Sequence, residues 1–242
     1  MHPAIIVFIY GSVTALATGL GTVPFAFVRS VSQRAVAYAN AVAAGLMLGA
    51  SFGLVAEGTD YGSWQTVAGA TIGVLLVLVT QRFLHKHDIQ LGSVSGPGAR
   101  RMFLMVIVMT IHSFAEGIAV GAAFAGGITL ALLITIAIAV HNVPEGLAIT
   151  AVLRPRGVTL PACAGWSIFS SLPQPLMAVP TFLFVDAFTP ALPYGLGVAA
   201  GAMVFMVLVE LLPEAYDNAR KPVIGLLVGV TLIGMILFQK YL

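Results

Sequence analysis

Long apolar stretches alternate with short polar, Gly- or Pro-containing connections along the whole chain. Most of the stretches reach the ~20 residues that an α-helix needs to cross the hydrocarbon core of a membrane. None of them shows the ~10-residue alternation of a membrane-barrel strand. The stretches cover residues 4–28, 35–56, 64–84, 102–125, 128–153, 159–185, 191–212 and 222–239. The pattern therefore predicts an all-α integral membrane protein, with eight transmembrane helices in a single transmembrane domain over residues 1–242.

The basic residues predict which way these helices run. When the connections are numbered from the N-terminus, every Lys and Arg except Lys240 lies in or beside an odd-numbered connection. Because positively charged connections stay in the cytoplasm, the odd-numbered connections are predicted to be cytoplasmic and both termini to lie outside. The longest connection, residues 85–101, contains Gly, Ser and Pro and is predicted to be a cytoplasmic loop.

Composition narrows the class of protein further. Of the 242 residues, 59% are hydrophobic and 8% are charged, whereas a soluble domain carries about 25% charged residues. This excludes an ordinary soluble enzyme and makes the lipid bilayer of the plasma or inner membrane the expected surroundings. The net charge of +2 gives no reason to expect a nucleic-acid partner. The single Cys163 cannot form an intrachain disulfide.

Two internal similarities suggest a repeated architecture. HSFAEGIAVG (112–121) and HNVPEGLAIT (141–150) share the pattern H-x-x-x-E-G. AVAAGLMLGASFG (41–53) and GVAAGAMVFMVLV (197–209) share A-A-G-x-M in the second and seventh stretches. Three stretches precede the central pair and three follow it, so the two halves would have opposite orientations. A 3+2+3 inverted repeat is a common way to build a transporter around a site in the membrane midplane.

Four ionisable residues lie in the middle of the two central stretches: His112, Glu116, His141 and Glu145. Ionisable groups at this depth are costly and indicate a functional site. The i,i+4 spacing places each pair on one helical face, and a short Gly-Gly turn makes the two helices antiparallel neighbours. Two imidazoles and two carboxylates suit Zn²⁺, although Fe²⁺, Mn²⁺, Co²⁺ or Ni²⁺ accept the same ligands.

A purely structural explanation is that these residues join two helices by buried hydrogen bonds. Backbone features agree better with a cavity: Pro144 interrupts one helix, and Pro173 and Pro175 break another at mid-depth. The neutral polar residues expected to complete the metal shell, or to hold it in place, are Ser113, Asn142 and Gln174.

The chain resembles the ZIP (Zrt/Irt-like) family of metal transporters, and in particular its bacterial zinc permease or GufA-like branch. The eight stretches, the paired His-x-x-x-Glu-Gly motifs and the segment VELLPEA (209–215) carry the resemblance. It implies uptake of Zn²⁺, or of Fe²⁺, Mn²⁺, Cd²⁺ or Co²⁺, into the cytoplasm, and often a homodimer. The first, fourth, fifth and sixth helices would form the metal-carrying bundle, and the others a scaffold.

The resemblance also bears on the number of metal ions. In members with two metals, a Glu of the sixth helix bridges them, and its counterpart here is the neutral Gln174. A single ion held by the two His-Glu pairs is therefore expected.

Acidic residues outside the centre suggest where ions arrive and leave. Glu57, Asp60 and Asp186 are expected near the outer surface as a possible entrance site. Glu210 and Glu214, spaced i,i+4 near a helix end, are expected near the cytoplasm as a possible exit site. Alternatively, these acids are simply solvated at the membrane surface or paired with Arg220 or Lys221.

Two other functions are weaker alternatives. An intramembrane metal-dependent hydrolase would need H-E-x-x-H, but Ser113 and Asn142 follow the two histidines. A non-transporting metal sensor would need an output domain, which the sequence does not add to the membrane unit. The sequence therefore predicts a transporter and no enzyme, with no catalytic cofactor.

Overall fold

The structure is a computed structural model that describes residues 2–27, 32–86, 90–91, 94–95, 97–125 and 127–241. The described chain is almost entirely helical. Its α-helices are α1 (Pro3–Leu20), α2 (Val23–Ala26), α3 (Gln33–Lys86), α4 (Pro97–Ala125), α5 (Ile128–Leu153), α6 (Leu160–Ser170), α7 (Pro173–Leu183), α8 (Val185–Phe188), α9 (Leu192–Met206), α10 (Leu212–Asn218) and α11 (Lys221–Tyr241). The short strands β1 (Gln90–Leu91) and β2 (Val94–Ser95) pair antiparallel.

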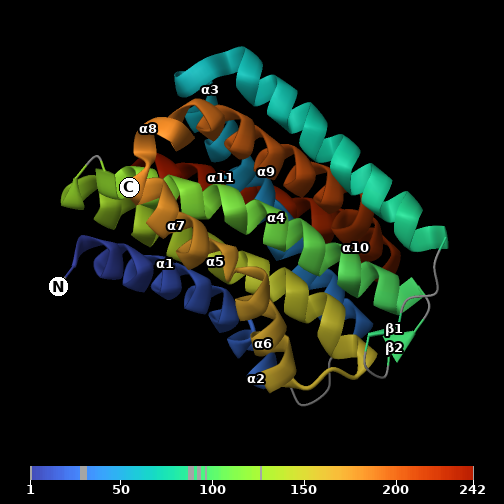
Figure 1. The fold of residues 1–242 in the computed structure, drawn as a ribbon. Helices are drawn as coiled ribbons and strands as arrows, with labels where there is room; N and C mark the ends of the chain where they lie inside the picture. The colour runs from blue at the N-terminus through green and yellow to red at the C-terminus, as the bar shows by residue number, and fades with distance from the viewer. Residues whose placement is uncertain are drawn as a thin grey trace.

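The long helices lie side by side along one axis (Figure 1). The two ends of the chain lie at one end of this bundle, together with α8. The strands β1 and β2, with α10, lie at the opposite end. The prediction of an all-α chain is confirmed, and the short hairpin is an addition that the apolar pattern did not predict.

Helix α3 joins two of the predicted stretches into one element of 54 residues. At about 1.5 Å per residue its two arms together contain ~80 Å of helix, well over twice the ~30 Å hydrocarbon core. The backbone leaves helical geometry at Gly62, where φ is 171° and ψ is 105°. The expected connection between residues 56 and 64 is therefore a kink, and helical turns continue up to it on both sides.

The predicted stretch 159–185 is divided into α6 and α7. Helix α6 ends at Ser170 and α7 begins at Pro173, with Ser171 and Leu172 between them. Pro173 occupies the first position of α7, where a missing N–H costs no helical hydrogen bond. The predicted break is thus present, but the prolines begin the second helix and do not interrupt it. Pro144, in contrast, lies inside the continuous helix α5.

Six helices of the described residues are long and apolar enough to cross a membrane. The kinked α3 counts once among them, and α6 and α7, of 11 residues each, are too short to count. Large apolar side chains remain exposed on the outer surface, for example Leu226, Val230 and Ile233 along one side of α11. Such an apolar exterior suits a lipid environment.

Close packing divides the helices into two groups. In the first group α3 packs mainly on α9 and α11, and in the second α1, α4, α5, α6 and α7 pack on one another. Contacts of α3 with α5 and of α4 with α9 join the groups. The largest buried cluster lies along this seam and is rich in methionine; it includes Met47, Met105, Met109, Met203 and Met206. Methionine fills irregular gaps because its side chain is unbranched and flexible.

Candidate metal centre

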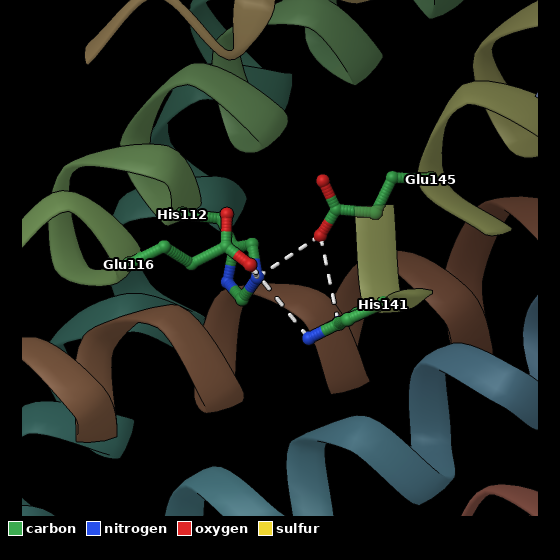
Figure 2. Close-up of side chains that lie close together, drawn as sticks. All are labelled: His112, Glu116, His141 and Glu145. Atoms are coloured by element: carbon green, nitrogen blue, oxygen red, sulfur yellow. Dashed lines mark ion pairs between the residues drawn. The ribbon is translucent and has the colours of Figure 1, made fainter. Parts of the chain in front are cut away.

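The centre is built on α4 and α5, which run antiparallel and are joined by a tight turn. Gly127 in this turn has a φ of 117°, a backbone conformation that glycine adopts without strain. His112 and Glu116 lie on α4, and His141 and Glu145 lie on α5, each pair one helical turn apart. The four side chains point toward one another between the two helices (Figure 2). The pairing expected from the two H-x-x-x-E motifs is therefore present.

The spacing of the ligand atoms suits one small cation. One ligand atom from each of the four residues can be chosen so that all lie within 4.8 Å of one another. The distance from His112 Nε2 is 2.9 Å to Glu145 Oε1 and 3.5 Å to Glu116 Oε1. His141 lies 3.7 Å from Glu116 Oε1 through Nδ1, and 3.6 Å from Glu145 Oε1 through Nε2. Ligands around a tetrahedral Zn²⁺ at ~2.0–2.1 Å lie about 3.3 Å apart. The two distances from His112 Nε2 lie on either side of this value, whereas His141 approaches the two carboxylates through different ring nitrogens, only one of which could bind the same ion.

These polar atoms are buried and incompletely satisfied by the protein. Each of the four residues is at most 4% exposed. Both carboxylate oxygens of Glu145, Oε1 of Glu116 and both ring nitrogens of His112 lack a well-aligned hydrogen bond. Unsatisfied buried polar groups are costly. A divalent cation would satisfy them together, and two ionised carboxylates would balance its charge.

A chain of hydrogen bonds lies behind Glu116. The side-chain amide nitrogen Nδ2 of Asn142 donates to the backbone oxygen of Thr14 at 2.7 Å and to Oε1 of Gln174 at 3.0 Å. Nε2 of Gln174 in turn donates to Oε2 of Glu116 at 2.5 Å. Asn142 and Gln174 therefore do lie beside the centre, as expected. Ser113, the residue that follows His112, is also fully buried, and its Oγ has no hydrogen-bond partner.

A cavity of about 600 Å³ leads to the centre from one side. Buried Glu116 and His141 line it at one end, and the exposed Asp60 and Lys240 line it elsewhere, together with the partly buried Glu57. Two of the three acids expected at an entrance thus border the cavity. The third, Asp186, is exposed on α8 and does not line it.

The two acids expected at an exit bind different partners. Glu210 lies in a π-helical turn (Val207–Leu211) and accepts a hydrogen bond from Nε2 of Gln81 at 2.9 Å. Glu214 accepts one from Nδ2 of Asn40 at 3.3 Å and lies 3.9 Å from Nη2 of Arg156. The Glu214–Arg156 pair joins α10, which packs on α3, to the short turn Arg154–Arg156 that follows α5, and so connects the two packing groups.

Sequence reasoning missed two features of the site. The backbone carbonyl of Thr14 anchors Asn142, but a carbonyl carries no sequence signal. Gln239 and Lys240 of α11 line the cavity, although Lys240 is the one basic residue outside the odd-numbered connections. The position of Lys240 in the sequence could have predicted this, because it places a charged residue at the same end of the bundle as Glu57 and Asp60.

Comparison with known proteins agrees with this geometry. Residues 84–237 match the family described as ZIP Zinc transporter. A longer Arabidopsis thaliana protein with a provisional name as a zinc transporter is 44% identical over 209 residues, which cover 85% of this chain and 34% of that protein. Zinc transporter ZupT of Corynebacterium glutamicum is 30% identical over 92% of this chain and 95% of its own length.

Zinc transporter ZIPB of Bordetella bronchiseptica is 35% identical over 92% of this chain and 77% of its own length. The matches thus extend over 95% and 77% of the length of these two bacterial relatives, and the family match includes α4, α5 and their four buried candidate ligands. The chain belongs to the ZIP zinc transporter family.

Proposed function

We propose that this protein carries Zn²⁺, or a related divalent transition-metal ion, across the plasma or inner membrane into the cytoplasm. The observation that carries the proposal is the buried group His112, Glu116, His141 and Glu145, whose ligand atoms lie within 4.8 Å of one another beside a cavity. The relatives that are named zinc transporters support zinc as the first choice. Fe²⁺, Mn²⁺, Cd²⁺ and Co²⁺ are the competitors.

We propose a single transmembrane unit with eight crossings in a 3+2+3 arrangement. Helix α3 is long enough for two crossings with the kink at Gly62 between them, and α6 with α7 supplies another. An even number of crossings agrees with the two chain ends lying at one end of the bundle (Figure 1). Positive residues such as Arg82, Arg154 and Arg220 flank the opposite connections, which supports placing both termini outside.

The cavity and the two helix groups suggest a route for the ion. An ion enters beside Glu57 and Asp60 and exchanges its water for the four ligands. It leaves toward Glu210 and Glu214 when the group α1, α4, α5, α6 and α7 moves relative to the group α3, α9 and α11. Asp186 contributes only to the potential of the outer surface in this scheme, because it does not line the cavity. The exposed apolar side chains form a surface that lipid and a second copy of the chain in a homodimer can cover.

Uptake of metal by purified protein in proteoliposomes tests the proposal. Wild-type protein is expected to take up Zn²⁺, and His141→Ala and Glu145→Ala are expected to reduce uptake to background, because each removes a ligand. Thr181→Val is the matched control, since Thr181 is buried in the same bundle but lies outside the group of four ligands. Uptake that persists in both ligand variants would overturn the proposal.

A further inference from the structure

Glu116 and Glu145 do not offer the same number of oxygens to a bound ion. Oε2 of Glu116 accepts the hydrogen bond from Nε2 of Gln174, and only Oε1 faces the two histidines, at 3.5 Å from His112 and 3.7 Å from His141. Neither oxygen of Glu145 accepts a well-aligned hydrogen bond, and the 2.9 Å contact of its Oε1 is with His112 Nε2, itself a candidate ligand. The protein therefore presents Glu116 as a single-oxygen ligand.

The orientation of Gln174 is fixed by its other neighbour. Asn142 Nδ2 donates both to the Thr14 carbonyl and to Oε1 of Gln174. Because Oε1 is the acceptor in that bond, the NH₂ group of Gln174 must face Glu116. Gln174 is fully buried, and both ends of its amide are engaged. It has no oxygen directed at the centre and acts on the ion only through Glu116.

Coordination number distinguishes the competing cations. Zn²⁺ is bound almost always by four ligands in structural sites, whereas Mn²⁺ and Mg²⁺ favour octahedral, oxygen-rich shells. Two histidine nitrogens, one oxygen of Glu116 and one oxygen of Glu145 give four ligands, or five if Glu145 binds with both of its oxygens. If Glu116 were free to rotate, its second oxygen could also bind the ion. Two oxygens from each glutamate and two histidine nitrogens would then give six ligands.

From this geometry we propose that Gln174, held by Asn142 and the Thr14 carbonyl, is a positioning residue that keeps Glu116 a single-oxygen ligand and so favours four-coordinate Zn²⁺ over six-coordinate Mn²⁺. This inference rests on the proposed function, since it concerns the metal preference of the same centre. In this proposal Gln174 does not touch the metal, and it affects which ion binds only by orienting Glu116.

Metal binding by the purified full-length protein tests this assignment, with Zn²⁺ and Mn²⁺ as separate probes. In Gln174→Leu the ratio of the Mn²⁺ Kd to the Zn²⁺ Kd is expected to fall at least about tenfold, a typical effect of losing a group that orients a metal ligand. X-ray absorption of the bound metal is expected to show more than four ligands, and the strong visible absorption of four-coordinate Co²⁺ is expected to weaken. Thr181→Val, on the same helix, is expected to keep the wild-type ratio and spectra.

Asn142→Asp provides a second variant that keeps the shape and the Oδ1 atom but has no amide donor. If Asn142 acts through Gln174, this variant is expected to lower the same ratio and to change the Co²⁺ spectrum. The inference would be overturned if a folded Gln174→Leu protein kept the wild-type Kd ratio and Co²⁺ spectrum. If Gln174→Leu does not fold, the same result in Asn142→Asp would overturn it.

Failure of the proposed function has a different signature. In that case wild-type protein would not bind Zn²⁺ at all, or His141→Ala would bind it as tightly as wild type, and this inference would fall with it. A wild-type protein that binds Zn²⁺ through His141, with the same metal preference in both positioning variants, would contradict only the role of Gln174.

Discussion

At the scale of single residues, the centre combines charged ligands from α4 and α5 with neutral groups from elsewhere. The four ligand candidates contribute two carboxylates for one divalent charge. Around them, Ser113, Asn142 and Gln174 are neutral and fully buried. A second cation would bring two further positive charges into a buried site with no further carboxylate among these neighbours, which is unfavourable at low dielectric.

We therefore expect one Zn²⁺ per chain in the membrane centre. Metal analysis of purified protein after removal of loosely bound ions is expected to give a ratio near one. Glu116→Ala and His112→Ala are each expected to lower this ratio toward zero. Two ions per chain that are both lost on substitution of Glu116 would show a shared two-metal centre and contradict the expectation.

Much of this centre could be predicted from the sequence, for a specific physical reason. The i,i+4 spacing fixes which side chains share a helical face, and the short turn at Gly127 fixes which helices are neighbours. The bond from Gln174 to Glu116, between residues 58 positions apart, could not be predicted in this way. It depends on the angle at which α7 begins after the break at Ser171 and Leu172.

At the scale of helices, the glycines of the two H-x-x-x-E-G motifs allow the elements of the centre to approach one another. A Cβ at Gly117 would collide with the backbone of Gln174 on α7, and one at Gly146 would overlap the Thr18 carbonyl on α1. The motif therefore provides ligands through His and Glu and close packing through Gly. The close approach of α7 brings Gln174 within reach of Glu116.

Gly146→Ala is accordingly expected to destabilise the protein by about 1–3 kcal/mol, the usual effect of overpacking a close-packed core. A thermal unfolding assay in detergent is expected to show a lower Tm. Gly165→Ala on α6 is the matched control, because an added Cβ there meets no atom within 4 Å. Equal unfolding temperatures for the two variants would contradict the close contact of α1 and α5.

The kink in α3 lies where the sequence predicts a connection between two helices. The backbone leaves helical geometry at Gly62, between residues 57 and 63, but the helical turns extend further into this polar segment from both sides than the apolar pattern predicts. Thr59 donates its side-chain hydroxyl to Ala56 O, and Thr66 donates to Gly62 O, one turn back. Polar side chains that bond to their own helix do not need to end it, and this segment contains no proline.

At the scale of the whole molecule, two acids, Glu57 and Asp60, lie on the side of the centre from which the cavity opens. Glu57 and Asp60 line the cavity that reaches His141, whereas Asp186 does not. Charged groups lining a depression raise the local concentration of oppositely charged ions, and the effect weakens as salt screens it.

Glu57→Gln combined with Asp60→Asn is therefore expected to raise the KM for Zn²⁺ uptake several-fold at low ionic strength and to leave kcat nearly unchanged. The increase in KM is expected to shrink at high ionic strength. Asp186→Asn is the matched control and is expected to have a smaller effect. A double variant whose KM equals that of wild type at low ionic strength would show that these carboxylates do not gather the ion.

The Arg156–Glu214 pair lies at the connection between the two helix groups, at the α10 end of the bundle and away from the chain ends. If an ion is released toward that end by movement of one group against the other, this contact between the groups changes. A metal ion held in the conformation described above would thus exchange with the solution beside Asp60, and each delivery to the opposite compartment would require a rearrangement. Such a protein would pass ions one at a time and would not dissipate a metal gradient as an open pore does.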